Sequence, residues 1–167
     1  HATVAGAELE LRKNLLEGTL KADGSHRLSA GLNASYIYTH ARVPLATHPG
    51  GSQLEGAAPS IVNADVSEHI RLRRAEITAT VVLNYFSDRV YTIGTEGYQD
   101  IIENGIPTLD LVLSARLAAR WDIGLKARNL LNPAHSLTRK GNATNAETVL
   151  SRYRKGADLS LGISYTL

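Results

Sequence analysis

The sequence alternates between apolar and polar residues with a period of two over most of its length. This is the period of a β-strand, whose successive side chains point to opposite faces of a sheet, whereas an amphipathic helix repeats about every 3.6 residues. Residues 109–117 show the pattern best, because every odd-numbered position is Leu or Ala. The positions between them are Asp110, Val112, Ser114 and Arg116. The chain is therefore predicted to be all-β and antiparallel.

About seven segments of the chain carry this alternation. They are residues 5–12, 28–39, 62–67, 77–86, 109–117, 123–128 and 158–167. The segment 62–67 is the least regular, because Glu68 follows it on the apolar side. We therefore expect about seven antiparallel strands, joined one after another as hairpins.

The length of these segments favours strands that cross a membrane over strands of a soluble sheet. Soluble strands average about 5 to 6 residues, whereas crossing a bilayer at a tilt takes about 9 to 11. Most of the segments keep the alternation for about nine residues or more. No stretch approaches the run of about 18 uncharged apolar residues that a membrane helix needs. The sequence thus predicts a transmembrane β-barrel of outer-membrane type.

The distribution of charge agrees with a barrel wall, whose lipid-facing side must avoid charged residues. Charged residues on the polar side of the segments include Glu8, Glu10, Arg12, Asp110, Arg116, Lys126 and Arg128. We accordingly expect Leu109, Leu111 and Leu113 to face lipid, and Asp110 and Ser114 to face the lumen.

Connection lengths supply an independent test, since outer-membrane barrels alternate short periplasmic turns with longer external loops. Long connections are expected at residues 40–60, 87–107 and 132–156. Short ones are expected at residues 70–76 and 120–122, with an intermediate one at residues 15–27. Two long connections never follow each other.

Aromatic residues mark the expected membrane interfaces, where Tyr and Trp gather. Tyr36, Tyr38, Tyr85 and Tyr91 lie near segment ends that lead into the long connections. Trp121 and Tyr165 are expected at the opposite rim.

Three stretches resemble the last strands of TonB-dependent outer-membrane receptors in their order and spacing. They are residues 54–64 (LEGAAPSIVNA), 83–91 (LNYFSDRVY) and 125–133 (LKARNLLNP). The final octet, SLGISYTL, is similar to the assembly signal of outer-membrane barrels, carried here by Ser160, Gly162, Tyr165 and Leu167. It departs from that signal at Leu167, where an aromatic residue is usual.

The resemblance implies a TonB-energised importer of a siderophore, vitamin or other nutrient, located in the outer membrane of a Gram-negative bacterium. Such receptors have a barrel of about 22 strands plugged by an amino-terminal domain. Residues 1–167 would form only the carboxyl-terminal strands of that barrel, without the plug. The implied partners are outer-membrane lipid, the barrel-assembly machinery, the remainder of the receptor and, through it, TonB.

Two other classes of protein remain compatible with parts of the sequence. A small self-contained barrel of about eight strands, with a structural or adhesive role, suits the chain length but needs one more strand. The candidate for that strand lies within residues 134–153, where Thr148-Val149-Leu150 is too short to cross a bilayer. An enzymatic barrel of phospholipase or protease type would need a His, a Ser and an acidic group brought together from neighbouring strands.

Catalytic, cofactor and metal sites are not predicted. The chain has no cysteine, and its six histidines have no spacing that places two on one metal ion. Asp110, Ser114 and Arg116 share one side of a strand, but at about 7 to 13 Å apart they form no hydroxyl relay by themselves. The 18 basic and 16 acidic residues are mixed along the chain, which gives no case for nucleic-acid binding.

Overall fold

The computed structural model describes residues 1–20, 24–42, 48–140 and 147–167. These residues form eleven β-strands and no helix. The strands are β1 (Ala2–Leu20), β2 (Gly24–Ala41), β3 (Ser60–Leu72), β4 (Ala75–Phe86), β5 (Arg89–Thr92), β6 (Ile101–Glu103), β7 (Ile106–Leu117), β8 (Trp121–Arg128), β9 (His135–Lys140), β10 (Glu147–Tyr153) and β11 (Asp158–Tyr165). Every strand pair is antiparallel, so the predicted fold class is confirmed at the level of an all-β antiparallel protein.

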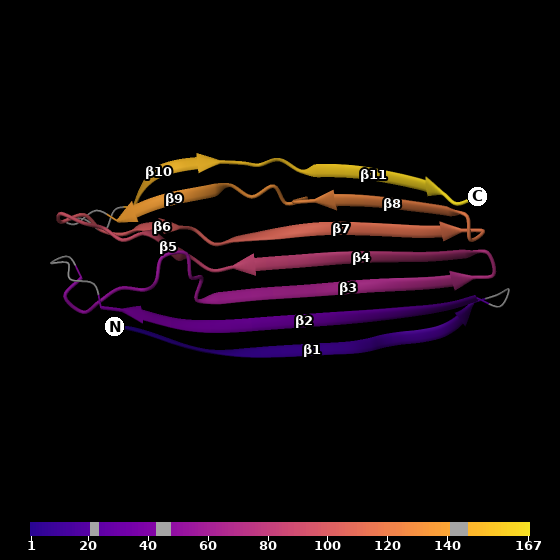
Figure 1. Cartoon of the computed structure of the whole chain (residues 1–167), viewed down its shortest axis with the longest axis horizontal. Helices are drawn as coiled ribbons and strands as arrows, with labels where there is room; N and C mark the ends of the chain where they lie inside the picture. Colours follow the sequence, from indigo (N-terminus) through magenta and orange to yellow (C-terminus); the bar gives the residue numbers. More distant parts are fainter. Residues whose placement is uncertain (21–23, 43–47, 141–146) are drawn as a thin grey trace.

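Seven long strands form one sheet in the order β1-β2-β3-β4-β7-β8-β11 (Figure 1). These strands contain the seven predicted segments in sequential order. Within the part of the chain that the structure describes, the sheet is open, with β1 and β11 at its two edges.

The first two strands are longer than predicted. β1 has 19 residues and β2 has 18, so the connection expected at residues 15–27 is wrong. Residues 15–20 and 24–27 of that range belong to β1 and β2, and residues 21–23 lie outside the described part of the chain. A bulge between Asn14 and Leu16 resets the alternation, which brings Leu16 opposite Leu28 on the apolar side. The irregular sequence around this bulge hid the continuation of the strand.

The predicted alternation of short and long connections is confirmed. The β3–β4 turn has only residues 73–74 and the β7–β8 turn only residues 118–120, and both lie at the end of the sheet opposite the long connections (Figure 1). The tight turn was expected at residues 120–122, but Trp121 and Asp122 already belong to β8. The turn forms earlier because Ala118 and Ala119 adopt φ values of 50° and 57°, the left-handed conformation that twisted hairpins favour.

The four short strands form a second sheet, in the order β10-β9-β6-β5, within connections that were expected to have no strands. It lies past the long-connection ends of β3, β4, β7, β8 and β11, level with the ends of β1 and β2 (Figure 1). The Thr148-Val149-Leu150 stretch lies in β10 and pairs with β9, so it does not add an eighth strand to the large sheet.

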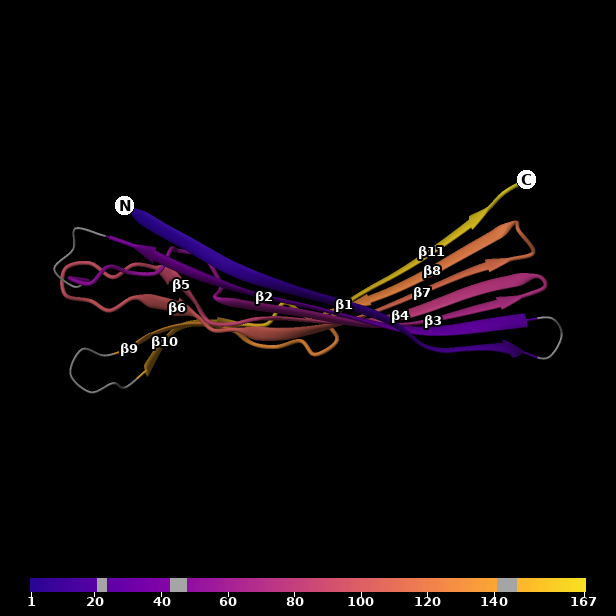
Figure 2. The same ribbon diagram turned by 90° about the horizontal axis from the view of Figure 1, so that it is seen from below.

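The large sheet is a single twisted layer (Figure 2). Its strands make their extensive contacts only with their neighbours in the sheet. Few apolar side chains are buried as a result, and those among the described residues are Ala58, Val90, Ile106 and Ala127. A sheet of this kind has no second layer to cover its apolar side, which soluble folds require.

Candidate functional site

The pairing register divides the large sheet into an apolar face and a polar face. Residues that are directly paired share a face, so side chains form rows across the strands. Three rows of the apolar face are Leu11-Leu32-Ala64-Leu83-Leu109, Ala30-Val66-Val81-Leu111-Ala127-Leu159 and Ile70-Ile77-Ala115-Ile123-Ile163. Leu109, Leu111 and Leu113 lie on this face, and Asp110 and Ser114 on the opposite one, as the alternation predicts.

Four lysine, histidine or glutamate side chains lie on the apolar face of β1, β2 and β3. They are Lys13, His26, His40 and Glu68. Glu68 lies where the alternation predicts it, and the structure adds a partner that the sequence did not reveal: His26 Nδ1 lies 3.1 Å from Glu68 Oε1. His26 is paired with Gly18, where a Cβ atom would lie 2.6 Å from the imidazole Nε2. The missing side chain of Gly18 therefore leaves room for this pair.

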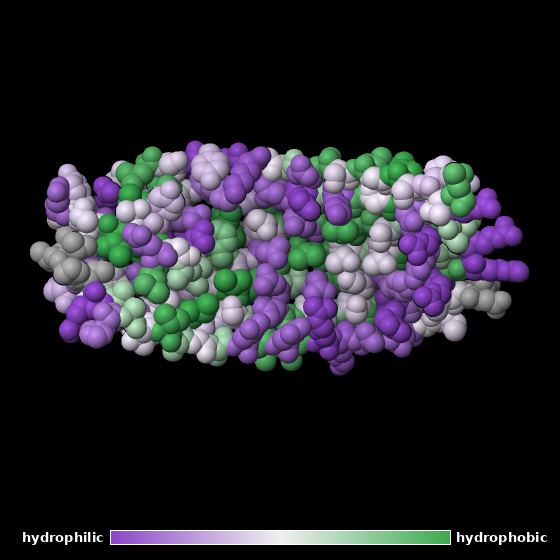
Figure 3. All heavy atoms as spheres, viewed as in Figure 1, coloured by the Kyte–Doolittle hydropathy of each residue, from purple (hydrophilic) through white to green (hydrophobic). Residues whose placement is uncertain are grey.

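The polar face holds ladders of hydrogen-bonding side chains. Ser67 Oγ lies 2.9 Å from Thr80 Oγ1, Asn84 donates to Thr108 at 3.4 Å, and the Asn33 amide donates to Glu8 Oε1 at 2.6 Å. All seven charged residues that were assigned to the polar side lie on this face by register. In Figure 3 hydrophilic side chains gather over β1 and β2 and toward the tight-turn end.

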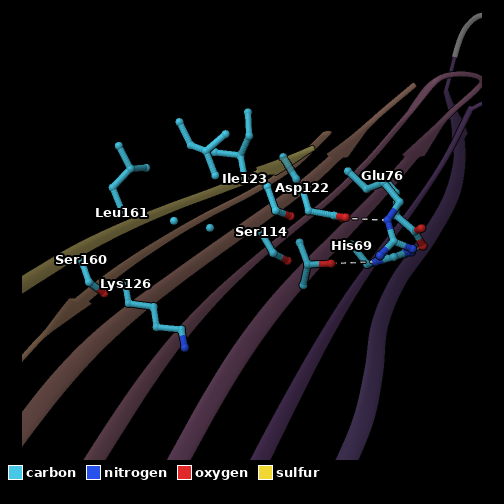
Figure 4. A pocket seen from close by; sticks show the side chains of 15 residues that line it. His69, Glu76, Ser114, Asp122, Ile123, Lys126, Ser160 and Leu161 are labelled. Atoms are coloured by element: carbon cyan, nitrogen blue, oxygen red, sulfur yellow. Dashed lines mark hydrogen bonds and ion pairs between the residues drawn. The ribbon is translucent and has the colours of Figure 1, made fainter. Parts of the chain in front are cut away.

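A shallow cavity of about 730 Å³ opens over β4, β7, β8 and β11 near the tight-turn end (Figure 4). Lys126, Ser160 and Ser114 line it from the polar face, while Ile123 and Leu161 extend from the opposite side of the ribbon. Two polar side-chain contacts lie at one end of the cavity. Arg116 Nε donates to Asp122 Oδ1 at 2.8 Å, and His69 Nε2 lies 3.2 Å from Glu76 Oε1.

The predicted lumen residues do not come together as a catalytic group. The Asp110 carboxylate accepts a hydrogen bond from the Asn129 backbone N–H at 2.8 Å, and Arg116 is held by Asp122. Ser114 is paired with Thr78 and Gly124, neither of which is a base. Among the described residues no group of three or more His, Cys, Asp or Glu side chains is placed to hold a metal ion.

The structure places the expected interface aromatics at three levels. Tyr36, Tyr38 and Tyr85 lie on the apolar face, at the ends of β2 and β4 that lead into the long connections. Tyr91 belongs to β5 in the second sheet. Trp121 lies at the opposite end, as expected, and packs against Tyr165 with ring centroids 4.7 Å apart.

The residues of the expected assembly signal divide between the two faces of β11. Ser160 and Gly162 are paired with Lys126 and Gly124 on the polar face, and Tyr165 is paired with Trp121 on the apolar face. Leu167 follows the last strand and is fully exposed. β11 is an edge strand, so its outer backbone groups have no partner among the described strands.

The long connections are joined to one another by a polar network that the sequence did not reveal. His48 Nε2 lies 2.9 Å from Asp100 Oδ1, the same oxygen that accepts the Gly94 backbone N–H at 2.7 Å. Arg89 Nη2 lies 2.7 Å from Glu103 Oε2 across the β5–β6 pair. The His48–Asp100 contact links two different connections, and the other two contacts lie within the connection between β4 and β7.

In the second sheet, His135 stacks on Tyr153, with ring centroids 5.2 Å apart and ring planes 9° from parallel. Burial lowers the pKa of His135, and the positive charge of Lys155 lowers it further, against a smaller opposing effect of Glu103. Both effects favour the neutral form of the imidazole.

Comparison with models of known protein families, with curated proteins and with solved structures finds no significant match for this chain. The resemblance to TonB-dependent receptors therefore stays a prediction. The described residues contain no helix that is long and apolar enough to cross a membrane.

Proposed function

We propose that the seven-stranded sheet is part of the wall of a transmembrane β-barrel in the outer membrane of a Gram-negative bacterium. In this arrangement the apolar face contacts lipid and the polar face lines an aqueous lumen. The observation that carries the proposal is the uncovered apolar face of a single-layer sheet. On β11, for example, Leu159, Leu161 and Ile163 are 72%, 67% and 60% exposed. Exposed apolar surface of this extent is normally covered by lipid or by a protein partner.

The height of the apolar face supports lipid as the covering medium. On β7 it extends from Pro107 to Leu117, which is ten residue steps. At about 3.3 Å per residue this is about 33 Å along the strand. A strand tilted by about 40° then spans about 25 Å, the height of the apolar band of outer-membrane barrels.

The open edges support a wall that is completed by further strands. In lipid, each unpaired backbone group at the outer edges of β1 and β11 costs several kcal/mol, so both edges need a pairing partner. The described connections contain no further long strand, because β9 and β10 pair within the second sheet. Additional barrel strands from the same receptor would supply the missing backbone partners.

Within this proposal, the resemblance of residues 54–64, 83–91 and 125–133 to TonB-dependent receptors favours a ligand-gated importer. The chain would contribute wall and external loops. The plug, the remaining strands and the contact with TonB would come from the remainder of the receptor, after insertion by the barrel-assembly machinery. The second sheet would then lie outside the membrane, where connections on a rigid scaffold commonly bind ligands.

Site-directed labelling tests the assignment of the faces directly, because the chain has no native cysteine. Leu111→Cys and Ser114→Cys lie on opposite faces of β7. Each variant is spin-labelled, and the whole chain is reconstituted into phosphatidylcholine vesicles. The label at position 111 is expected to be relaxed mainly by oxygen, which concentrates in lipid, and the label at position 114 mainly by a water-soluble nickel chelate. Equal access of both labels to the chelate would reject the membrane wall.

A second measurement separates a wall segment from a small closed barrel. A closed barrel would run in detergent as a single species whose mobility changes on heating, and it could form a pore by itself. The isolated chain is expected to show neither heat-dependent mobility nor saturable uptake of a solute into vesicles. Saturable uptake by the isolated chain would favour the small closed barrel instead.

A further inference from the structure

The tight-turn end of the large sheet carries a cleft lined by arginines. Its volume is about 810 Å³, and it lies between the β3–β4 turn and the β7–β8 turn. The arginines that line it are Arg71, Arg73, Arg74, Arg116 and Arg120, which we call the arginine rim. Glu76 is the acidic residue that lines the same cleft. In Figure 3 hydrophilic side chains project from this end of the molecule.

Part of this positive charge is compensated and part is not. Arg71 Nη2 lies 3.2 Å from Glu76 Oε1, and Arg116 is paired with Asp122. Arg73, Arg74 and Arg120 are exposed and form no ion pair with any described residue. The cleft thus has an excess of positive charge.

The backbone holds the two turns together. The Ala118 N–H donates to the Arg74 carbonyl oxygen at 2.7 Å, and the Thr166 N–H donates to the Arg120 carbonyl oxygen at 2.8 Å. Three chain segments that are remote in sequence therefore meet at the arginine rim. Arg73, Arg74 and Arg120 are carried by these short, anchored turns, so little backbone freedom is lost when an anion binds.

An apolar and aromatic row lies directly beside the arginine rim. Paired residues Leu72, Ala75, Leu117, Trp121 and Tyr165 form the last row of the apolar face. Leu72, Trp121 and Tyr165 are all substantially exposed. Along the direction from the apolar face toward the tight turns, aromatic residues come first and arginines follow. A membrane has the same order of layers, because acyl chains are followed by the interface and then by the phosphates.

We propose that the arginine rim binds the phosphate groups of anionic phospholipids in the leaflet next to the tight turns. This inference rests on the proposed membrane location of the sheet. Guanidinium groups suit phosphate because they donate several hydrogen bonds in a planar fork. The neighbouring row of Leu72, Trp121 and Tyr165 would contact the acyl chains of the same lipids.

The test uses Trp121, the single tryptophan of the chain, as a reporter beside the rim. The whole chain is reconstituted into vesicles of phosphatidylcholine and phosphatidylglycerol in which one of the two lipids is brominated. Quenching of Trp121 by each brominated lipid gives the relative association constant of the two lipids. We expect phosphatidylglycerol to be preferred by about fivefold or more, because one arginine near an anionic surface contributes about that factor.

Two triple variants with the same loss of charge locate the effect. Arg73→Gln/Arg74→Gln/Arg120→Gln removes the unpaired arginines, and the preference for phosphatidylglycerol should fall to near one. Arg152→Gln/Arg154→Gln/Lys155→Gln removes three positive charges from β10 and the segment after it, at the other end of the molecule, and should retain the preference. Equal loss in both variants would mean that net charge alone attracts the lipid, which overturns the proposed site.

The remaining outcomes distinguish three cases: binding of lipid phosphate, binding of a soluble anion, and absence of the sheet from the membrane. Loss of the preference on adding inorganic phosphate or polyglutamate, at constant ionic strength, would assign the rim to a small anion or an acidic polypeptide and reject the lipid. Equal quenching by both brominated lipids would reject this inference alone. Absence of quenching by either lipid would reject the membrane wall, and this inference with it.

Discussion

Trp121 and Tyr165 face each other across the β8–β11 pair, with ring centroids 4.7 Å apart and ring planes inclined by 50°. The contact fastens the end of β11, an edge strand with only one neighbour in the described sheet. A tilted aromatic pair of this kind contributes about 0.5 to 1.5 kcal/mol beyond the area that it buries. It gives the aromatic residue of the expected assembly signal a structural role within the sheet.

We predict a coupling free energy of about 0.5 to 1.5 kcal/mol between Trp121→Leu and Tyr165→Leu in a double-mutant cycle. The measurement is the free energy of unfolding by urea in detergent or lipid. Tyr38→Leu combined with Trp121→Leu is the control, because Tyr38 lies at the opposite end of the large sheet. In the control pair, the two losses in free energy of unfolding should be additive. If the losses for Trp121→Leu and Tyr165→Leu were also additive, the ring contact would contribute nothing.

The two faces of β7 should respond differently to a buried charge in a bilayer. Leu111 lies in the middle of the apolar face, paired with Val81 and Ala127. Leu111→Arg should destabilise a full-length parent barrel in lipid by about 2 to 4 kcal/mol. Ser114→Arg, on the polar face, should cost much less because a lumen is hydrated. Unfolding titrations in phosphatidylcholine vesicles measure both, and similar costs would contradict the assigned faces.

Asn129 anchors the connection between β8 and β11 at both of its ends. It has a φ of 55°, its N–H donates to Asp110 Oδ1, and its side-chain amide donates to the Gly156 carbonyl oxygen at 2.6 Å. Asn129→Ala should destabilise by about 2 to 3 kcal/mol, since it loses the amide hydrogen bond and strains the left-handed backbone.

Asn129→Gly is the matched variant for this position, because glycine relieves the backbone strain but not the lost hydrogen bond. It should cost about 1 kcal/mol less than Asn129→Ala. The free energy of unfolding in urea measures both. If the two variants were equally stable, the positive φ would have no energetic consequence at this position.

The β9–β10 pair should weaken in acid. The pKa of His135 is lowered in the folded chain, first by burial and then by Lys155, so the unfolded chain binds a proton more readily. The stability that depends on neutral His135 is therefore present above its ordinary pKa of 6.5 and is lost as the pH falls below that value.

NMR titration of the His135 ring, with proteolysis of residues 147–153 as a second readout, measures this effect. His135→Gln should remove the pH dependence of proteolysis over this range, while His69→Gln, in the large sheet, should retain it. A His135 titration at or above 6.5 would contradict the prediction.

Local alternation was sufficient to predict the seven long strands and the two faces. Leu111 and Ser114 could be assigned to opposite faces because side-chain direction in a strand depends only on position parity. The same rule placed Glu68 on the apolar face. It failed near Asn14, where a bulge adds one residue and shifts the parity for the rest of β1.

The sequence by itself determined which stretches form long strands, which face each side chain occupies and at which end the long connections lie. These properties depend on neighbours within about ten residues, whose pattern is visible along the chain. Tertiary structure decided which distant residues meet: β6 with β9, His26 with Glu68, Asp110 with Asn129, and the arginine rim from two separate turns. Such pairs form because strand register brings together groups that are far apart in the sequence, 19 positions for Asp110 and Asn129 and 42 for His26 and Glu68, and no local period encodes that register.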